Sequence, residues 1–502
     1  MKSSKNERVK EKIKRKLEIS ATDVFEYVKC PAFFKQYVSS GKRLEDCYDK
    51  YYHDIIFQTG KDYELSEMEK YYFIENTQSL TDLLHNKTIS VIRIKPGTIL
   101  KRKIYVSNEK SKQFNKIYAI GRPDLIIREK DTNKFIPLDY KTSLSLFNSI
   151  RFQLYHYCYI LQEYDANIPY LGILKSGKLD TFLLNLNILD LEWKQIINSI
   201  ILIKGGGFSE RKIIREDIRW TKECRKCLFN SVCEKIVKSN PTIKDLPEVK
   251  KRRSQIINSL GIKSLEELAK TNPKVLWEKI LKIPDGKVVF NSELTVKQII
   301  GTARAFLEKK IILLSQNLQS LNIKTNDVFF DSEYISSKTN PEVFSISLGI
   351  IKSDEFLLIK NWFANSISQG EKILSSFYDY LNNKGVKRVF GWGIKAGGEL
   401  TQLNKISPLP PEISFHDLYY NIKNNMAMPV LSYSLKSVSK FLFGDQFQDK
   451  IKIGLAAIGL YGKFLNTGNI EYKESIIEYN KKDVLQTYEI ACWYERFCKE
   501  YN

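Results

Sequence analysis

The chain has 502 residues, 43% of them hydrophobic, which is enough for about two to four domains. Lysine and arginine total 79 against 58 acidic residues, a formal net charge of +21. An excess of this size favours a polyanionic partner, although a solubility device or a non-catalytic scaffold would also account for it. No apolar run of about 18 residues is present, and the basic N-terminus lacks the apolar core of a secretory signal. We therefore expect a cytoplasmic protein with no membrane contact.

The first half of the chain changes from helical to β-rich patterns. Residues 1–18 are predicted as a basic tail, and residues 19–80 as mostly helical. Residues 130–133 have the composition of a hairpin turn. Alternating or apolar runs predict strands over 88–95, 103–107, 116–129 and 134–142. A helix is predicted next, over 151–164, and then a hairpin over 170–186.

A composition shift after Lys238 indicates a linker, and residues 250–310 have the pattern of short helices. From residue 327 a new β-rich series begins, and helices and strands alternate to the end, as in α/β domains. No phosphate-binding loop of the GxxxxGK[ST] kind is present, so the chain encodes no motor. The sequence therefore predicts a multidomain α/β protein with boundaries near 19–238, 239–320 and 325–502.

Two acids and a lysine stand on neighbouring predicted strands. Asp124 ends the first strand, and Asp139 and Lys141 share one face of the next because side chains alternate along a strand. Carboxylate oxygens hold Mg²⁺ or Mn²⁺, which polarise a phosphodiester and activate water, and an ammonium stabilises developing negative charge. An exposed hairpin with weak surface ion pairs would give the same isolated pattern.

The surroundings of these residues carry a family resemblance. Gln153 and Tyr157 lie one helical turn apart downstream, and Glu64 stands upstream in a helical G-x-x-x-E context. GRPD, LDYKT and QLYHY, in that order, resemble the PD-(D/E)xK nucleases of the RecB type, which include relatives associated with CRISPR adaptation. The resemblance implies a restriction-endonuclease-like core over 19–238. It also implies that Glu64 is the third metal ligand, with His53 as the competing residue, and that Gln153 and Tyr157 support the site and contact DNA.

Four cysteines form a second pattern around this segment. Cys224, Cys227 and Cys233 are clustered, and Cys30 lies far upstream in a Cys-Pro context. Their spacing suits zinc or an iron–sulfur cluster equally. The resemblance to RecB-like nucleases with this arrangement implies a [4Fe–4S] cluster that staples the two ends of the domain together. We interpret the remaining cysteines as structural; they are Cys47, Cys158, Cys492 and Cys498.

Residues 251–280 have the pattern of helix, tight turn and helix. Gly261 lies in the turn, and Ser264 with Glu267 forms a capping-box pair at the start of the next helix. Backbone amides at such a helix start form an anion site. The segment resembles a helix-hairpin-helix, a module that binds the DNA backbone. A plain αα-hairpin between domains is the alternative, and the neighbouring basic residues 251–253 favour DNA.

A second acidic pattern occupies residues 325–502. Asp331 and Glu333 share one face of a predicted strand, and Tyr479 and Asp483 lie one turn apart on a predicted helix. This set resembles the DEDD exonuclease branch of the RNase H-like fold, together with the segment LSYSLKSVSKFLFG before the last helix. The resemblance implies two metal ions held by these acids, with the tyrosine orienting the attacking water.

The second motif of that family departs from its usual aspartate. Glu399, in FGWGIKAGGELTQL, is the nearest acid in register, and Asp417 better matches a non-catalytic position. The longer side chain of glutamate moves the carboxylate, and a displacement of about 1 Å can cost about a hundredfold in rate. This site is therefore expected to be active, slow or retained only for nucleic-acid binding.

The whole pattern predicts a metal-dependent DNA nuclease that uses Mg²⁺ or Mn²⁺ on single-stranded DNA or DNA ends. DNA repair or end processing is the expected setting, with a helicase acting in trans because none is encoded. The alternative is a non-catalytic iron–sulfur DNA-binding scaffold that partners a helicase or CRISPR adaptation machinery.

Overall fold

The computed structural model describes the chain from residue 15 onward with gaps. The described residues are 15–47, 74–75, 79–86, 88–96, 98–105, 114–141, 146–176, 181–218, 220–221, 224, 227–335, 341–353, 355–447, 451 and 454–501. They divide into two compact units. The first is Met1–Thr221 with Cys227–Cys233, and the second is Lys222–Lys226 with Glu234–Asn502.

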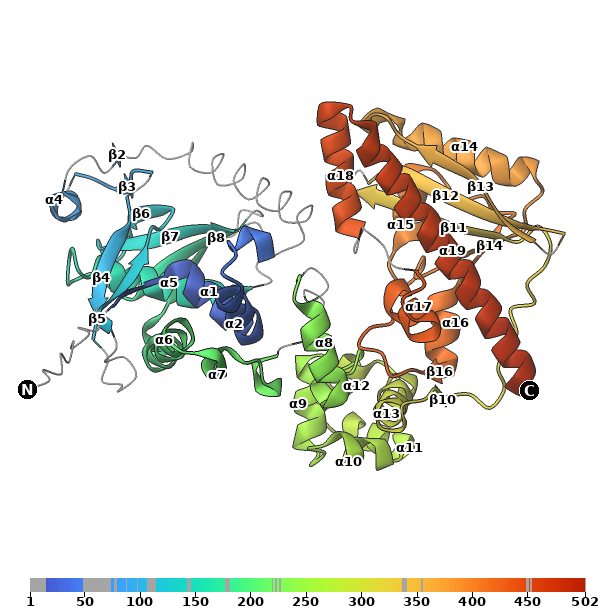
Figure 1. Ribbon diagram of the computed structural model, residues 1–502, viewed down its shortest axis with the longest axis horizontal. Coiled ribbons are helices and arrows are strands. Elements are labelled where there is room, and N and C mark those ends of the chain that lie inside the picture. Colours follow the sequence, from blue (N-terminus) through green and yellow to red (C-terminus); the bar gives the residue numbers. More distant parts are fainter. Residues whose placement is uncertain are drawn as a thin grey trace, which may run out of the picture. The chain divides into compact units, whose positions relative to one another are not determined.

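In the first unit, the described strands form a six-stranded sheet, β2-β3-β6-β7-β8-β9, and a three-stranded sheet, β1-β5-β4 (Figure 1). The strands are β1 (Arg15–Ser20), β2 (Ile74–Glu75), β3 (Val91–Arg93), β4 (Leu100–Ile104), β5 (Phe114–Gly121), β6 (Leu125–Arg128), β7 (Phe135–Lys141), β8 (Leu171–Ser176) and β9 (Thr181–Asn185). The helices are α1 (Ala21–Lys29), α2 (Pro31–Ser40), α4 (Leu80–His85), α5 (Phe147–Leu161), α6 (Asp190–Gly205) and α7 (Phe208–Arg211).

The centre of the larger sheet follows the predicted pattern. β3, β6 and β7 are antiparallel neighbours, and the predicted turn at 130–133 joins β6 to β7. Helix α5 then connects β7 to the parallel strand β8, which pairs with β9 as the predicted hairpin. Eleven of the fifteen residues of α5 are buried, because the helix packs against α1 and against both sheets. The helix over 151–164 and the strands within 88–95 and 134–142 are confirmed. The run 116–129 is instead two strands of different sheets, β5 and β6, separated at residues 122–124, and the run 103–107 is a strand only as far as Ile104, with 106–107 outside the described residues.

Strand β1 is a difference from the prediction. Residues 15–18 were assigned to a basic tail, and residue 19 onward to a helical segment, but Arg15–Ser20 forms a strand parallel to β5. Its partner lies about a hundred residues away, so no local periodicity could have indicated the pairing. Ser20 then caps α1 by accepting a hydrogen bond from the Asp23 amide at 3.0 Å, and the helix follows as predicted.

The second unit begins with a helical part that follows α8 (Asn230–Ser239), which spans the boundary between the units. The predicted short helices are confirmed, and glycine at Gly301 allows the last of them to approach Ala427 closely. These helices are α9 (Lys251–Ser259), α10 (Leu265–Lys270), α11 (Pro273–Leu281), α12 (Gly286–Phe290) and α13 (Glu293–Glu308).

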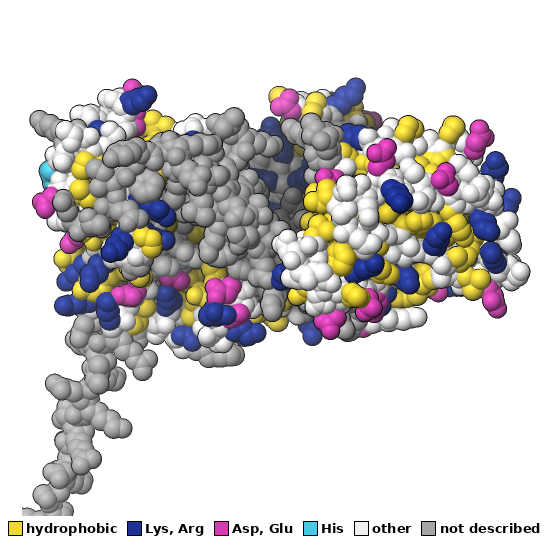
Figure 2. Space-filling view, turned by 90° about the horizontal axis from the view of Figure 1, so that it is seen from above, with side chains coloured by type: hydrophobic (Ala, Val, Ile, Leu, Met, Phe, Trp, Pro, Cys, Tyr) yellow, Lys and Arg dark blue, Asp and Glu magenta, His cyan; other side chains and the backbone are white. Residues whose placement is uncertain are grey.

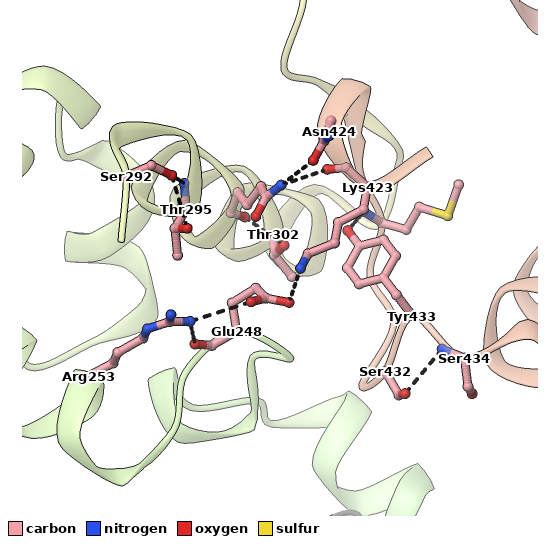
Figure 3. A network of polar contacts seen from close by, with 12 residues as sticks. Glu248, Arg253, Ser292, Thr295, Thr302, Lys423, Asn424, Ser432, Tyr433 and Ser434 are labelled. Atoms are coloured by element: carbon pink, nitrogen blue, oxygen red, sulfur yellow. Dashed lines mark hydrogen bonds and ion pairs between the residues drawn. The ribbon is translucent and has the colours of Figure 1, made fainter. Parts of the chain in front are cut away.

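A polar network fixes the helical part to the rest of the second unit (Figure 3). Glu248 lies between Arg253 and Lys423, with its carboxylate oxygens 3.4 Å from Arg253 Nη1 and 2.8 Å from Lys423 Nζ. Gln298 of α13 donates to the Lys423 carbonyl and to Asn424 Oδ1. The segments predicted as separate domains, 239–320 and 325–502, therefore pack as one compact unit.

The C-terminal part of the second unit is built on a five-stranded sheet, β13-β12-β11-β14-β15. β11, β12 and β13 are antiparallel, while β14 and β15 run parallel to β11. The strands, with the separate pair β10–β16, are β10 (Ile312–Leu313), β11 (Val328–Ile335), β12 (Glu342–Lys352), β13 (Glu355–Phe363), β14 (Arg388–Gly391), β15 (Ser414–Asp417) and β16 (Met426–Ala427). The helices are α14 (Gly370–Asn383), α15 (Glu399–Ile406), α16 (Leu418–Asn425), α17 (Leu435–Phe443), α18 (Gly454–Thr467) and α19 (Ile470–Tyr501).

Helices cover both faces of this sheet. Phe330 stacks on Phe377 of α14, whereas Phe329, the preceding residue of β11, packs edge-on against Tyr488 of α19. The two faces of β11 therefore point to different helices, and the long helix α19 crosses the sheet (Figure 1). Within the described part of the chain, every helix is too short or too polar to cross a membrane.

Candidate active site

Strand β11 presents two acids to helix α19. Asp331 and Glu333 have the same strand parity as Phe329, so they lie on the α19 face. Asp483 comes from α19, and Tyr479 lies one turn before it on the same helix. Carboxylate oxygens of Asp331, Glu333 and Asp483 all lie within 4.8 Å of one another. Among the described residues, this is the one group of three or more His, Cys, Asp or Glu side chains brought that close.

The electrostatics of this group are those of a cation site. Burial, followed by the charge of Asp483, raises the pKa of Asp331 and that of Glu333 well above their ordinary values. Burial and the same aspartate also raise the pKa of Tyr479, which keeps its hydroxyl neutral. Like charges so close in a buried place are unfavourable without a positive partner, and carboxylate oxygens are the ligands that Mg²⁺ and Mn²⁺ prefer.

A buried polar chain, which the sequence did not indicate, holds Asp331. Asn480 Nδ2 donates to Asp331 Oδ2 at 2.5 Å, and Ser345 Oγ donates to Asn480 Oδ1 at 3.1 Å. Asn361 of β13 donates in turn to Ser345 and, at 2.8 Å, to Ser347. Ser347 lies opposite Asp331 in the sheet register, and Ser345 lies opposite Glu333. The polar face of three strands thus positions the first acid.

A lysine, also not predicted, enters the site from α17. Lys436 Nζ donates to Asp483 Oδ1 at 2.8 Å and lies 4.3 Å from the centre of the Tyr479 ring. Its charge acts against the rise in the Glu333 pKa. Lys436 belongs to the segment that carried the resemblance to the DEDD branch, but neither spacing nor residue type distinguished it from the neighbouring Lys440.

Residues 328–495 match the model of the RNase_H superfamily. The search among curated proteins finds no match. The C-terminal part of the chain therefore contains an RNase H-like domain, which suggests a nuclease-type hydrolase that acts on nucleic acid. The matched segment contains the whole acidic group and Lys436.

Glu399, the expected second-motif acid, does not join the three carboxylates of the RNase H-like domain. It starts α15, and its Oε1 accepts a hydrogen bond from Ser332 Oγ, whose side chain points to the α14 face of β11. Burial raises the pKa of Glu399 to about 7, and the bond from Ser332 offsets part of that rise. The charge of Glu399 contributes to the raised pKa of Asp331 and Glu333, so it lies near the group without belonging to it.

Asp417 organises the loop that precedes Glu399. Its two carboxylate oxygens accept backbone hydrogen bonds of 2.8–3.0 Å from Gly393, Lys395, Ala396 and Tyr419. A carboxylate used in this way has a structural role, which agrees with its expected non-catalytic position.

Glu399→Gln should change how the stability of the protein depends on pH. The unfolded chain releases this proton near pH 4.5 but the folded protein near pH 7, so the contribution of Glu399 is full below about 4.5 and is lost as pH rises to about 7. The loss should be about 3 kcal/mol for the single group. Urea unfolding in chelator between about pH 5 and 8 should show that the free energy of unfolding of Glu399→Gln increases relative to that of wild type as pH rises. Glu412→Gln, an exposed acid, is the control; a pH-independent difference between Glu399→Gln and wild type would contradict the assignment.

The first predicted constellation also comes together. Asp139 and Lys141 share one face of β7, with Lys141 Nζ 2.6 Å from Asp139 Oδ2, and Tyr140 points to the opposite core. Asp124 Oδ2 accepts a hydrogen bond from the Tyr140 amide at 2.7 Å, which places it beside the same strand. Asp139 is 1% exposed, so the alternative of a weak surface ion pair on an open hairpin does not hold.

Helix α5 adds the two further predicted residues. Gln153 Nε2 donates to the Tyr157 hydroxyl at 3.2 Å. Burial and then the charges of Asp139 and Asp124 raise the pKa of Tyr157. A side chain on Gly121 would meet the Tyr157 ring at 2.9 Å, which explains the glycine of the GRPD motif. Glu64 and His53, the competing third ligands, lie outside the described residues.

The cysteine segments of the first unit lie side by side. Phe33 of α2, three residues after Cys30, packs 5.9 Å from Phe229, and the Leu228 amide donates to the Cys47 carbonyl at 3.4 Å. Cys30, Cys227 and Cys233 belong to the first unit, and Cys224 belongs to the second. Zinc thiolates about 2.3 Å from one ion would lie closer together than 4.8 Å, and no three described cysteines do.

The other cysteines have packing roles. Cys158 is buried and donates to the Leu171 carbonyl, and burial raises its pKa. Burial likewise raises the pKa of Cys47, Cys492 and Cys498. This agrees with their interpretation as structural.

The predicted anion site in the α9–α10 turn is already satisfied by the chain. The amides of Lys263 and Ser264 donate to Glu267 Oε2 at 2.6 and 3.2 Å, and Gly261, at φ +87°, donates back to Asn258. Arg253 donates to the Val289 carbonyl. The first helix and the tight turn are confirmed, but the predicted second helix is divided into α10 and α11. The start of α10 offers a phosphate no open amides at Lys263 and Ser264, and one of the three basic residues is used internally.

Proposed function

We propose that the protein is a divalent-metal-dependent nuclease that hydrolyses phosphodiester bonds in DNA and has two acidic sites. The observation that carries the proposal is the convergence of Asp331, Glu333 and Asp483 in a domain that matches the RNase_H superfamily. Their oxygens would hold Mg²⁺ or Mn²⁺, which supplies phosphate polarisation and water activation when bound. Tyr479, kept neutral beside Asp483, donates a hydrogen bond that orients water.

The first unit supports a second cutting site of the RecB-like PD-(D/E)xK type. Asp124 and Asp139 would hold the metal with Glu64, while Lys141 stabilises negative charge on the phosphate and Gln153 and Tyr157 support the site. The support is the ion pair of Lys141 with the buried Asp139, the position of Asp124 beside the same strand, and the raised pKa of Tyr157 in the field of both acids. A buried ion pair is costly to retain for stability alone, which favours a chemical role.

Single-stranded DNA or DNA ends are the proposed substrate, in repair or end processing with a helicase in trans. The net charge of +21 supports a polyanionic substrate. On the face of the second unit in Figure 2, Lys and Arg side chains are dispersed among hydrophobic and acidic ones, so charge marks no single track there. Base-sequence specificity is not expected.

The full chain, incubated with end-labelled single-stranded DNA and Mn²⁺, tests the proposal. Cleavage that a chelator abolishes supports it, and matched RNA and duplex substrates define the preference. DNA binding without cleavage would contradict the enzyme and favour the non-catalytic scaffold. Product lengths from variants at each site then separate end-directed from internal cutting.

We propose that Cys30, Cys224, Cys227 and Cys233 bind a [4Fe–4S] cluster. The resemblance to RecB-like nucleases with this cysteine arrangement supports the cluster, and so does the adjacency of the α2 and 227–233 segments. A four-iron cluster bonds each thiolate to a different iron, so its ligands stand farther apart than those of one zinc ion.

Cys227→Ala should remove most of the iron and lower the melting temperature, because the cluster closes a very long loop. Iron, zinc and sulfide analysis of the anaerobically purified chain measures this, with Cys492→Ala as the control. Zinc in place of iron in the unmodified protein, or unchanged iron in Cys227→Ala, would refute the cluster.

A further inference from the structure

The acidic site of the RNase H-like domain contains a cation of its own. Lys436 Nζ forms an ion pair at 2.8 Å with Asp483 Oδ1, and Asp483 is one of the three converging acids. The same ammonium lies 4.3 Å from the Tyr479 ring, a cation–π distance that favours its charged form. A positive charge at this place competes directly with a metal ion for Asp483.

The position of Lys436 is fixed by its neighbours. Tyr433, three residues earlier, accepts the Trp392 indole N–H on its carbonyl and the Met428 amide on its hydroxyl. Leu435 and Val438 of α17 are buried in the core shared with α19. The lysine side chain is 27% exposed, well below that of Lys440, one turn further on, at 53%. Lys436 is therefore built into the site.

For the described residues that converge here, the charges balance with one metal ion. The three converging carboxylates carry three negative charges, and one divalent ion with one ammonium carries three positive charges. A second divalent ion would add an excess of positive charge and would be repelled by Lys436 at short range.

Among the described residues, the ligands are also too few for a pair of ions. In two-metal nucleases the ions lie about 3.5–4 Å apart and share carboxylates from several residues. Glu399, the fourth acid that such a pair would need, is bonded to Ser332 on the other face of β11. The position of Glu399 and the presence of Lys436 thus both favour a single metal ion at this site.

We propose that Lys436 takes the place of the second cation, so that the RNase H-like site binds one divalent ion per chain. This rests on the proposed metal-dependent activity of the domain. The Lys436 ammonium then supplies a fixed positive charge beside Asp483 that stabilises the negative charge of the phosphate oxygens, as cations do in electrostatic catalysis.

Manganese binding tests this without relying on activity. The full chain carries Asp124→Asn and Asp139→Asn, so that only the RNase H-like site is counted. Equilibrium binding should give one Mn²⁺ per chain, with the electron paramagnetic resonance spectrum of an isolated ion. Adding Lys436→Met should raise the count to two and produce the spectrum of a spin-coupled pair. Lys440→Met, on the same helix, and Lys436→Arg, which keeps the charge, should each leave one ion.

The outcomes separate this inference from the function beneath it. A coupled pair with Lys436 intact overturns the inference and leaves the metal-dependent function standing. A single ion in a folded Lys436→Met protein also overturns it. If the Asp124→Asn, Asp139→Asn protein binds no Mn²⁺, both the inference and the metal-dependent function are overturned. Wherever Mn²⁺ does bind, adding Asp331→Asn should abolish that binding.

Discussion

Asp331→Asn should reduce cleavage by the RNase H-like domain roughly a thousandfold or more, since a metal ligand contributes several kcal/mol to the transition state. The measurement uses the full chain with Asp139→Asn, so that the first site is silent. The same change should raise the melting temperature in chelator. The raised pKa of Asp331 means that its charge destabilises the folded, metal-free site, and the neutral amide removes that charge.

The combination of lower activity and higher stability separates loss of chemistry from loss of fold. Glu355→Gln, an exposed acid at the start of β13, is the control and should change neither quantity. Retained cleavage in Asp331→Asn, combined with retained cleavage in Asp483→Asn, would show that these acids are not the metal ligands of the cleavage reaction.

Lys141→Met and Asp139→Asn should each reduce the rate of cleavage by the first unit roughly a hundredfold to a thousandfold or more. These variants are measured with Asp331→Asn, which silences the second site. Lys141→Met alone should also lose up to about 3 kcal/mol of stability, because it leaves the buried Asp139 carboxylate without its partner.

The double variant Asp139→Asn, Lys141→Met removes both charges and should recover most of that stability without recovering cleavage. Lys130→Met, in the exposed turn between β6 and β7, is the control. Cleavage by the folded double variant would show that the first constellation is not a catalytic site.

The features that the sequence predicted were those with a local period. The i, i+2 spacing of Asp331 and Glu333 on a strand, and the i, i+4 spacing of Tyr479 and Asp483 on a helix, set shared faces before any tertiary contact. The resemblance then supplied the long-range step, that these two faces meet. The same reasoning placed Asp139 and Lys141 together on β7.

The features that the sequence missed arise from long-range register. Lys436 and Asn480 have no distinctive spacing, and their roles depend on how α17 and α19 cross the sheet. The order of motifs along the chain predicted Glu399 as a metal ligand, but its carboxylate accepts a hydrogen bond from Ser332 on the other face of β11. Strand β1 was missed because its partner, β5, is distant in sequence.

The docking of the helical part through Glu248 determines where the protein can be divided. A fragment starting at residue 325 would lose β10, the partner of β16, and would uncover Lys423 and Asn424, which bind Glu248 and Gln298. It would retain every acid of the RNase H-like site and still begin inside a packed interface. The compact unit that carries this site includes Glu234–Asn502, so a fragment that keeps the unit whole also keeps the helices before the nuclease sheet.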